Sequence, residues 1–582
     1  MVFYPPKWVP KLPNIPDDVA ICDFMLDDRY GRHPLGYSLD PFTCGLSGKS
    51  YSALEVVDRV DYLARALAKE FGWQPNKGSE WDKVLAIFSV NTIDTLPLAW
   101  ATHRLSGVVS PANAAYSASE LTHQLVDSKA KALFTCLPLL STALEAAEKA
   151  GIPKNRIYLL EVPDQLLGGA KAPPEFKTVS QLIKEGESLP QLEKLKWSPG
   201  QGSRTTAFLC YSSGTSGLPK GVMISHRNVI ANTIQIATYE SKWREKLIEP
   251  GNVSAYTDRA LCLLPMSHIY SLVVICHAGP YRGDQAIVLP KYELNLYLSA
   301  IQNFRIASLF LVPPIIVTML ANKETCRKYD LSSVRALFTG AAPLGAETAA
   351  DLQKEYPKWL IRQGYGLTET CTVVCSTDPS DIWLGSSGCL LPGYEARLMS
   401  PDGKEITGYD QPGELVVRSP SVVLGYLNNE KANKETFEDG WMRTGDEAVI
   451  RLSPNNTEHI FIVDRIKELI KVKGMQVAPA ELEAHLLTHP AVVDCAVIGA
   501  PDEAAGEVPK AFVVKSPSAG SDDAAIIQSI QKHVQDHKAR HKWLKGGVEF
   551  IDAIPKSPSG KILRRKLRDM ERERRRKARA KL

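Results

Sequence analysis

The sequence lacks the features of a membrane-spanning or disulfide-stabilised protein. Its longest apolar run, residues 307–320, is interrupted by two prolines and is shorter than the about 20 residues that span a bilayer. The eleven cysteines are odd in number and scattered, without the paired spacing of a disulfide framework or a zinc site. Three of the first ten residues are prolines, at a place where a signal peptide would have an apolar helix. These absences predict an intracellular, soluble protein.

The chain also lacks a strong net charge. The 582 residues carry +4, but residues 561–582 alone carry +9, which leaves −5 for the remainder. A basic tail could contact RNA or anionic lipid. A solvated helix surface is the better explanation, because the rest of the chain is mildly acidic. A nucleic-acid-binding protein is therefore the least favoured function.

Length and patterning predict several domains, since 582 residues exceed what one hydrophobic core supports. Strand-like runs alternate with helical patterns up to about residue 390, as in parallel α/β sheets, whereas residues 164–200 read as a linker. The predicted fold is α/β. An N-terminal domain, residues 1–463, contains two α/β subdomains and a small β subdomain, and a smaller α+β domain follows over residues 464–582.

One segment, residues 211–221, has the composition of a phosphate-binding loop. It reads Tyr-Ser-Ser-Gly-Thr-Ser-Gly-Leu-Pro-Lys-Gly and follows an apolar run that predicts a buried strand. Glycines let backbone N–H groups approach a ligand, and successive N–H groups form an anion-binding concavity. The segment lacks the Gly-Lys-Ser/Thr ending of a Walker loop. A Ser/Gly-rich surface loop is the alternative interpretation.

Three later positions add groups suited to a nucleotide. Residues 340–344 are small and follow a predicted strand, which would leave a slot for a flat ring or simply form a tight turn. In residues 362–370, Thr368 and Glu369 place a hydroxyl beside a carboxylate, which suits a phosphate-bound magnesium ion. Asp446 follows a turn, where its carboxylate either binds a ribose diol or caps the turn.

In this order, the segments resemble those of the adenylate-forming superfamily, which includes acyl-CoA synthetases, beetle luciferases and amino-acid adenylation domains. The resemblance covers residues 205–565, with a charged segment at residues 464–474 and a lysine loop at residues 555–565. It is strongest to 4-coumarate–CoA ligase-like and fungal phenylacetyl-CoA ligase-like enzymes. It implies ATP, Mg²⁺ and coenzyme A as cosubstrates and cofactor, and a mobile C-terminal domain.

The same resemblance assigns roles to residues of this chain. Catalysis is assigned to Lys561, Lys220, Thr368, Glu369 and His268, with Glu369 on the metal. The implied ATP/AMP site contains Ser212, Ser213, Gly214, Thr215, Ser216, Gly217, Lys220, Gly340, Ala341, Ala342, Pro343, Gln363, Gly364, Tyr365, Gly366, Thr368, Asp446, Arg465 and Lys561. The implied hinge and thioester-step residues are Lys467, Lys471, Gly474 and Gln476.

The acid pocket is implied by residues 264–271, which resemble the acyl-site stretch of 4-coumarate–CoA ligases. The implied lining is His268, Tyr270, Val274, Phe338, Ala341, Gly364, Thr372 and Val373. Such an apolar, aromatic slot suits a flat aryl acid or a medium fatty chain. The plant ligases have proline in place of Thr372 and commonly methionine in place of Phe338, which disfavours hydroxycinnamate and favours phenylacetate-like acids.

The predicted function is an ATP-dependent acid–CoA ligase that forms an acyl-AMP and transfers the acyl group to CoA. The alternatives are a luciferase-like oxygenase, a medium- or long-chain fatty acyl-CoA synthetase, and a carrier-protein-loading adenylation domain. The last is disfavoured because residues 267–271 lack that group's aspartate. The terminal residues Ala580, Lys581 and Leu582 are a variant of a peroxisomal address, which predicts an import receptor as partner and a peroxisomal, otherwise cytoplasmic, location.

Overall fold

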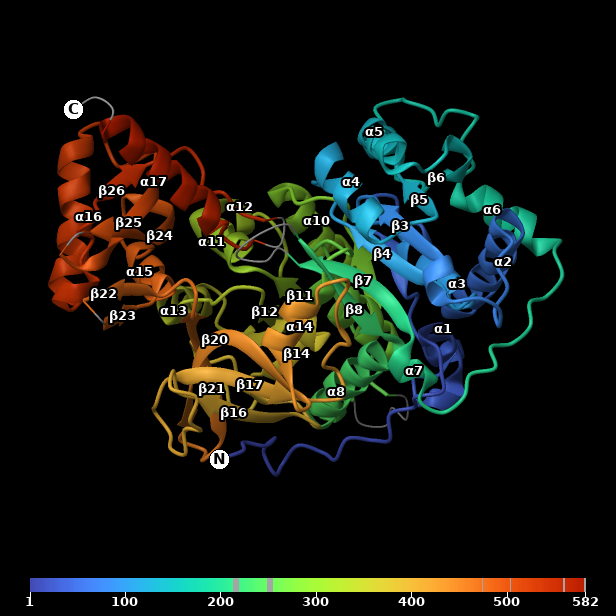
Figure 1. Ribbon diagram of the computed structural model, residues 1–582, viewed down its shortest axis with the longest axis horizontal. Helices are drawn as coiled ribbons and strands as arrows, with labels where there is room; N and C mark the ends of the chain where they lie inside the picture. Colours follow the sequence, from blue (N-terminus) through green and yellow to red (C-terminus); the bar gives the residue numbers. More distant parts are fainter. Residues whose placement is uncertain (213–218, 249–254, 474, 503, 558–559, 580–582) are drawn as a thin grey trace.

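The fold is described from a computed structural model of the 582 residues. The structure describes the whole chain except residues 213–218, 249–254, 474, 503, 558–559 and 580–582. It is α/β, as predicted: two sheets with helices, a small antiparallel sheet, and a C-terminal unit that stands at one end of the molecule (Figure 1).

The first sheet has seven strands in the order β18-β8-β7-β4-β3-β5-β6. Their bounds are β3 Val84–Phe88, β4 Val108–Ala112, β5 Ala132–Thr135, β6 Ile157–Leu159, β7 Thr206–Ser212, β8 Lys220–Ser225 and β18 Gly425–Tyr426. Strands β3 to β7 are parallel, and β8 and β18 add antiparallel edges. All five residues of β3 are buried. Parallel sheets are covered on both faces, which is why such strands are continuous apolar runs in the sequence.

The second sheet has nine strands in the order β15-β14-β13-β12-β11-β9-β10-β1-β2. Their bounds are β1 Phe42–Cys44, β2 Ser50–Tyr51, β9 Arg259–Cys262, β10 Gln285–Val288, β11 Ser308–Leu311, β12 Ala336–Thr339, β13 Leu360–Leu367, β14 Thr372–Ser376 and β15 Cys389–Leu390. Its centre, from β1 to β13, is parallel. The carboxyl ends of such strands are where α/β proteins bind ligands, and the predicted site segments follow β7, β9 and β12.

Two smaller sheets follow. The antiparallel one contains β16 Glu395–Met399, β17 Gly413–Arg418, β19 Phe437–Glu438, β20 Trp441–Leu452 and β21 Glu458–Arg465. The C-terminal one contains β22 Ile470–Val472, β23 Met475–Val477, β24 Val492–Asp502, β25 Gly506–Lys515 and β26 Val548–Phe550. Strand β21 continues two residues past the predicted domain boundary at residue 463.

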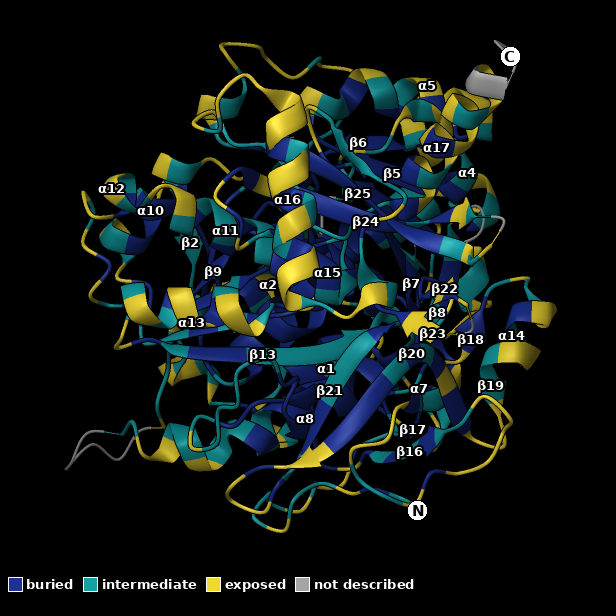
Figure 2. Cartoon of the chain, turned by 90° about the vertical axis from the view of Figure 1, so that its left-hand side faces the viewer, coloured by how far each residue is buried: buried dark blue, intermediate teal, exposed yellow. Residues whose placement is uncertain are grey.

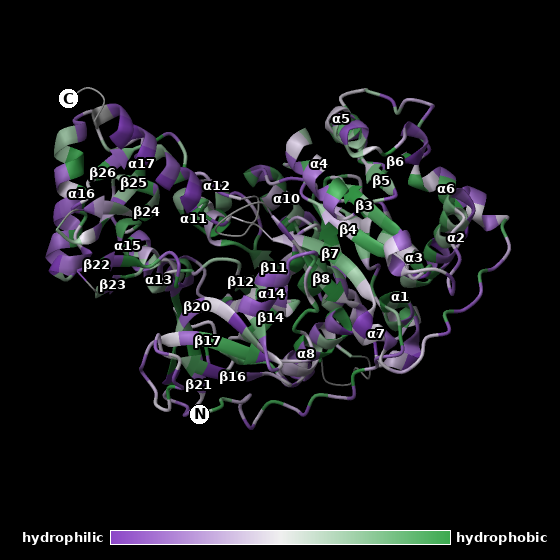
Figure 3. Ribbon diagram, viewed as in Figure 1, coloured by the Kyte–Doolittle hydropathy of each residue, from purple (hydrophilic) through white to green (hydrophobic). Residues whose placement is uncertain are grey.

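Helices cover the sheets. The longer ones are α2 Ala53–Phe71, α3 Thr95–His103, α4 Ala118–Asp127, α5 Leu140–Ala150, α8 His226–Glu245, α10 Leu294–Phe304, α11 Pro313–Ala321 and α13 Ala346–Glu355. Helix α2 begins at a capping box, in which the Ser52 hydroxyl accepts from the backbone N–H of Glu55 and the Glu55 carboxylate accepts from that of Ser52. Buried strands lie inside and exposed helix faces outside, as the burial and hydropathy colouring show (Figures 2 and 3).

Residues 164–200 are not only a linker. They contain helix α6, Val179–Glu187, with a capping box between Thr178 and Gln181 and a buried face that packs on α2. The two helices approach so closely that a side chain at Gly186 would overlap the backbone of Tyr62. The helix spans only nine residues in a Pro- and Lys-rich stretch, so its periodicity is weak in the sequence.

The C-terminal unit has its own hydrophobic core between its sheet and helices α15, Pro479–Leu486, and α16, Asp523–His537. The basic tail forms α17, Arg564–Arg579, which the charge pattern predicts as a helix. One side of α17 packs on β24: Leu567 is buried, and buried Glu571 accepts from the ammonium of Lys510.

All eleven cysteines lie among the described residues, buried and free. Within the described part of the chain, no helix is long and apolar enough to span a bilayer.

A buried ion-pair cluster joins the start of α17 to the rest of the C-terminal unit. The Arg564 guanidinium donates to Glu468 at 2.7 Å and to Glu483 at 2.6 Å, and all three side chains are nearly inaccessible to water.

We expect Arg564→Met to lower the free energy of unfolding by about 3–5 kcal/mol, because it leaves two buried carboxylates unpaired. Denaturant unfolding measures the change. Arg572→Met, which removes an exposed pair with Asp569, is the matched control and should stay within about 0.5 kcal/mol; equal effects of the two variants would contradict this account.

Candidate active site

A cavity of about 820 Å³ lies where the two large sheets, the small antiparallel sheet and the lysine loop meet. Most of the predicted site residues line it, although they come from segments up to 350 residues apart in the chain. The predicted residues in its wall are Ser212, Lys220, His268, Tyr270, Phe338, Gly340, Ala341, Gly364, Tyr365, Gly366, Thr368, Glu369, Thr372, Val373, Arg465, Lys467 and Lys561.

Other predicted residues lie elsewhere. Val274 lines a second, buried cavity of about 50 Å³, behind Phe338. Ala342 and Pro343 continue the loop that follows β12. The backbone N–H of Gln363 donates to the Thr377 hydroxyl, and its carbonyl accepts from the Thr377 N–H. Lys471 and Gln476 are exposed on the β22–β23 hairpin, outside the cavity wall. Ser213, Gly214, Thr215, Ser216, Gly217 and Gly474 lie outside the described residues, as do Ala580, Lys581 and Leu582.

Asp446 stands directly behind the cavity wall. Its carboxylate accepts a hydrogen bond of 2.6 Å from the Tyr365 hydroxyl, and the Arg465 guanidinium lies 3.4 Å away. Burial raises the pKa of Asp446, and the positive charge of Arg465 opposes that rise. In the antiparallel pair β20–β21, Asp446 lies directly opposite Arg465, so the register of the strands brings the carboxylate and the guanidinium together.

Glu369 follows β13 in a short 3₁₀ turn. Its carboxylate accepts from the Ser212 hydroxyl at 3.3 Å and from the Tyr426 hydroxyl at 2.9 Å. The ring of Tyr426 also lies under the Lys220 ammonium, 4.8 Å from its centre. A carboxylate held by two hydroxyl donors keeps further lone pairs for a cation.

Tyr426 is a site residue that the sequence reading missed. It belongs to β18, a strand of only two residues, and no motif marks it. Its strand pairs with β8 at the edge of the first sheet, which carries it beside Lys220. Only the paired register reveals this placement, because a two-residue strand has no detectable period.

Lys561 comes from the C-terminal unit and enters the cavity from the loop before α17. Burial and the nearby charge of Arg465 together lower the pKa of Lys561 to about 8, although the carboxylates of Glu468, Asp446 and Glu369 oppose the shift. Burial also lowers the pKa of His268 to about 4, with a contribution from the Lys561 charge. His268 is therefore neutral at physiological pH, whereas Lys561 brings a positive charge close to it.

The other end of the cavity is apolar. The ring of Phe338, on β12, lies against Gly364, where any added Cβ would come within 2.3 Å of the ring. The Tyr270 hydroxyl donates to the Phe338 carbonyl at 2.9 Å, and the Thr372 hydroxyl donates to the Ile269 carbonyl at 3.0 Å. Phe338 thus lines both cavities and separates the large one from the small one.

Two family models match the sequence. The model described as AMP-binding enzyme matches residues 38–427, and the model described as AMP-binding enzyme C-terminal domain matches residues 481–561. The first model covers more than half of the chain.

Similar proteins agree over nearly the whole length. The acyl-CoA ligase easD of Emericella nidulans is 42% identical over 574 residues, which are 98% of this chain and 100% of that protein. The acyl-CoA ligase cm3C of Cordyceps militaris is 41% identical over 588 residues, 98% of this chain and 90% of that protein. The crystal structure of the anthranilate CoA ligase AuaEII with anthranoyl-AMP has the same fold, with a TM-score of 0.78 at 23% identity over 96% of this chain and 98% of that one. The chain therefore belongs to the AMP-binding enzyme family, the adenylate-forming superfamily that its motifs predicted.

Proposed function

We propose that the protein is an ATP-dependent acid–CoA ligase that activates an aryl or medium-chain carboxylic acid as an acyl-AMP and then forms the thioester. The fungal relatives named as acyl-CoA ligases support the reaction class. The observation that carries the mechanism is the position of Lys561. This lysine belongs to the C-terminal unit but lines the same cavity as the predicted motifs of the N-terminal domain.

The first half-reaction needs an oxygen of the acid's carboxylate to attack the α-phosphate of ATP, with pyrophosphate leaving. Both reactants are anions, so the barrier is mainly electrostatic. Lys561 and Lys220 line the cavity and bring positive charge to it, and neutral His268 adds no charge. Asp446, held by Tyr365, is positioned to bind the ribose hydroxyls once that tyrosine hydroxyl gives way or shares the carboxylate.

The proposed magnesium site is Glu369. The residues fit the ion, because Mg²⁺ prefers one or two protein carboxylates together with substrate phosphates and water. Glu369 is a carboxylate of this kind, lining the cavity beside Thr368. When bound, the ion would neutralise phosphate charge. Glu369 itself is held in place by the hydroxyls of Ser212 and Tyr426.

The second half-reaction needs a different arrangement. Lys561 lines the cavity, whereas the predicted thioester-step residues Lys471 and Gln476 are exposed on their hairpin outside its wall. A rotation of the C-terminal unit about Lys467 would withdraw the lysine loop and present the hairpin instead. Lys467 is exposed between β21 and β22, where the chain passes from one unit to the other.

The proposed acid is small or flat. The acyl end of the cavity is bounded by aromatic and apolar groups, with Phe338 as its floor and Tyr270, Val373 and Ala341 along its sides. Such a slot accommodates a phenylacetate-like acid, or a medium chain that stops at the Phe338 ring.

Lys561→Ala tests the two-step mechanism. We expect acid-dependent pyrophosphate release to fall roughly 10²–10³-fold, because a cation aimed at developing charge is lost. Thioester formation from supplied acyl-AMP and CoA should be nearly unchanged, since Lys561 acts only in the first arrangement. Both half-reactions are measured on one panel of aryl and short- to medium-chain acids. Equal loss in the two half-reactions would contradict the mechanism, and no acid-dependent pyrophosphate release by the wild type would contradict the function.

The pH dependence of the first step follows from the pKa of Lys561, lowered to about 8 by burial. The lysine is charged below that pH and neutral above it, so kcat/KM for acyl-AMP formation should fall as the pH rises through about 8. Lys561→Arg keeps its charge throughout this range because a guanidinium has a pKa above about 12. We expect the variant to lose the alkaline limb of the profile. An unchanged limb would assign it to another group.

Phe338→Ala is expected to shift preference toward longer acids, because the ring lines both cavities and its removal would open the acyl end toward the small one. Each additional buried methylene contributes about 0.8 kcal/mol, so the ratio of kcat/KM for octanoate to that for phenylacetate should rise about 10-fold or more. Phe310→Ala is the control. Phe310 lines only the small cavity, so its removal should lower stability without changing the ranking of acids. The same ranking in both variants would show that Phe338 does not limit the slot.

We also propose a peroxisomal location, through recognition of Ala580, Lys581 and Leu582 by an import receptor. Deleting the three residues should leave catalysis intact and move a fluorescent fusion from peroxisomes to the cytosol. A fusion in which the fluorescent protein precedes the chain keeps the terminus free and is the form to compare. An unchanged location after the deletion would show that the terminal match has no targeting role.

A further inference from the structure

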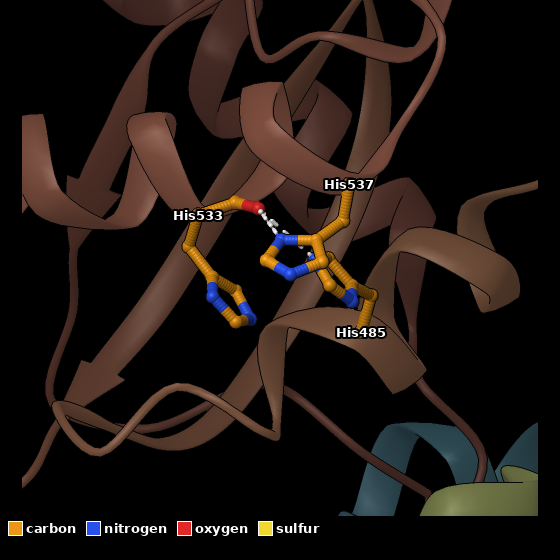
Figure 4. A group of neighbouring side chains, drawn as sticks. All are labelled: His485, His533 and His537. Atoms are coloured by element: carbon orange, nitrogen blue, oxygen red, sulfur yellow. Dashed lines mark hydrogen bonds between the residues drawn. The ribbon is translucent and has the colours of Figure 1, made fainter.

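A group of histidines lies in the C-terminal unit, outside the wall of the active-site cavity. His485 is on α15, and His533 and His537 are one helical turn apart on α16. One ring nitrogen of each lies within 4.8 Å of one from each of the others. Figure 4 shows the three rings gathered between the two helices. The ligase mechanism uses none of them.

Hydrogen bonds determine which nitrogen of each ring carries the proton. His485 Nε2 and His537 Nδ1 lie 3.2 and 2.9 Å from the same acceptor, the backbone carbonyl of His533, so both must donate (Figure 4). The Thr488 hydroxyl donates to the His485 carbonyl and lies 2.9 Å from His533 Nε2, so its oxygen accepts from that nitrogen. Each neutral ring therefore keeps one unprotonated nitrogen.

This is the arrangement by which proteins prepare imidazoles for metals. A metal-binding histidine usually donates its other ring N–H to a carbonyl or another oxygen, which fixes the tautomer and the ring orientation. Here all three rings are held in that way, two of them by one carbonyl oxygen. His485 and His533 also stack, with ring centres 4.3 Å apart and planes 5° from parallel. The in-plane lone pairs of two parallel rings cannot both aim at one ion, so metal binding requires the partly exposed His533 ring to turn out of this stack.

We propose that His485, His533 and His537 form a binding site for a divalent transition-metal ion of the zinc type, which links α15 to α16. Imidazole ligands suit Zn²⁺, Cu²⁺ and Ni²⁺ and not Mg²⁺ or Ca²⁺. Three protein ligands leave a fourth tetrahedral position for water.

The geometry requires only side-chain movement. Zinc–nitrogen bonds of about 2.0–2.1 Å place tetrahedral ligand atoms about 3.4 Å apart. One ring nitrogen from each histidine lies within 4.8 Å of the others, so these atoms must approach by somewhat more than 1 Å. Any ring whose nitrogen in this group is the one that donates to a carbonyl or hydroxyl must also turn over to present its unprotonated nitrogen. His537 is exposed at the last residue of α16 and His533 is partly exposed, so both rings can rotate without disturbing the core.

Such a site would stabilise the C-terminal unit and leave the chemistry unchanged. An ion that binds the folded chain raises its melting temperature by mass action. The ion would join two helices that already meet through the core behind them and through the hydrogen bonds of His485 and Thr488 to His533.

The test uses untagged full-length protein, stripped of metal with a chelator and dialysed. Titration with ZnCl₂ is followed by calorimetry and by the melting temperature. His533→Gln and His537→Gln each remove one ligand, and His541→Gln, a histidine of the same segment outside the group, is the matched control. Titration with Co²⁺ reports the geometry, because tetrahedral and octahedral cobalt differ strongly in visible absorption.

We expect one zinc ion per chain, a melting temperature that rises with zinc, and at least a tenfold loss of affinity in both ligand variants but not in His541→Gln. Acid-dependent pyrophosphate release should be the same with and without zinc. Absence of stoichiometric binding, or affinity that both ligand variants retain, would overturn the proposal. If His533→Gln does not fold, His537→Gln gives the same decision, since its side chain is exposed.

Discussion

Electrostatic repulsion between a carboxylate and a triphosphate is the constraint on which the rest of the site depends. In the proposed mechanism, the buried ammonium group of Lys561 in the active-site cavity offsets this repulsion. Burial lowers the pKa of Lys561 to about 8, so keeping the cation in place has a cost that the nearby carboxylates Glu468, Asp446 and Glu369 partly offset. Two of these carboxylates, Asp446 and Glu369, are the groups proposed to hold the ribose and the magnesium ion. One set of charges therefore serves both the lysine and the nucleotide.

In the proposed mechanism, Lys561 must also leave the cavity before the thiol attacks. The ion pairs of the C-terminal unit indicate which residues would move with it. Three residues after Lys561, Arg564 is bound to Glu468 and Glu483 in a buried cluster. Glu468 directly follows the proposed pivot, Lys467. The ion pairs therefore join the start of α17 to the first residues beyond the pivot, so a rotation at Lys467 would carry α17, and Lys561 just before it, away from the cavity. A single rotation thus separates two chemical steps that one fixed arrangement could hardly serve.

Much of this was predictable from the sequence. Parallel strands buried on both faces appear as continuous apolar runs. The motifs that follow β12 and β13 lie at the carboxyl edge of one sheet and the motif that follows β7 at that of the other, and residues of both edges line the cavity. What escaped prediction depends on pairing over long distances. Tyr426 sits in a two-residue strand, and α6 is short. Val274 is separated from the cleft by a Phe338 ring whose direction no local pattern specifies. The domain boundary and the roles of the individual site residues stay predictions.

In the proposed mechanism, a carboxylate oxygen of the acid attacks the α-phosphate of ATP. Transfer of oxygen tests it most directly. With the acid labelled by ¹⁸O in both carboxylate oxygens, one complete turnover with ATP and CoA is analysed by mass spectrometry of the AMP and pyrophosphate formed. The account predicts one ¹⁸O atom in each AMP and none in pyrophosphate, because the bond between the acyl carbon and that oxygen breaks when the thiol attacks. Unlabelled AMP, or label in pyrophosphate or phosphate, would contradict it.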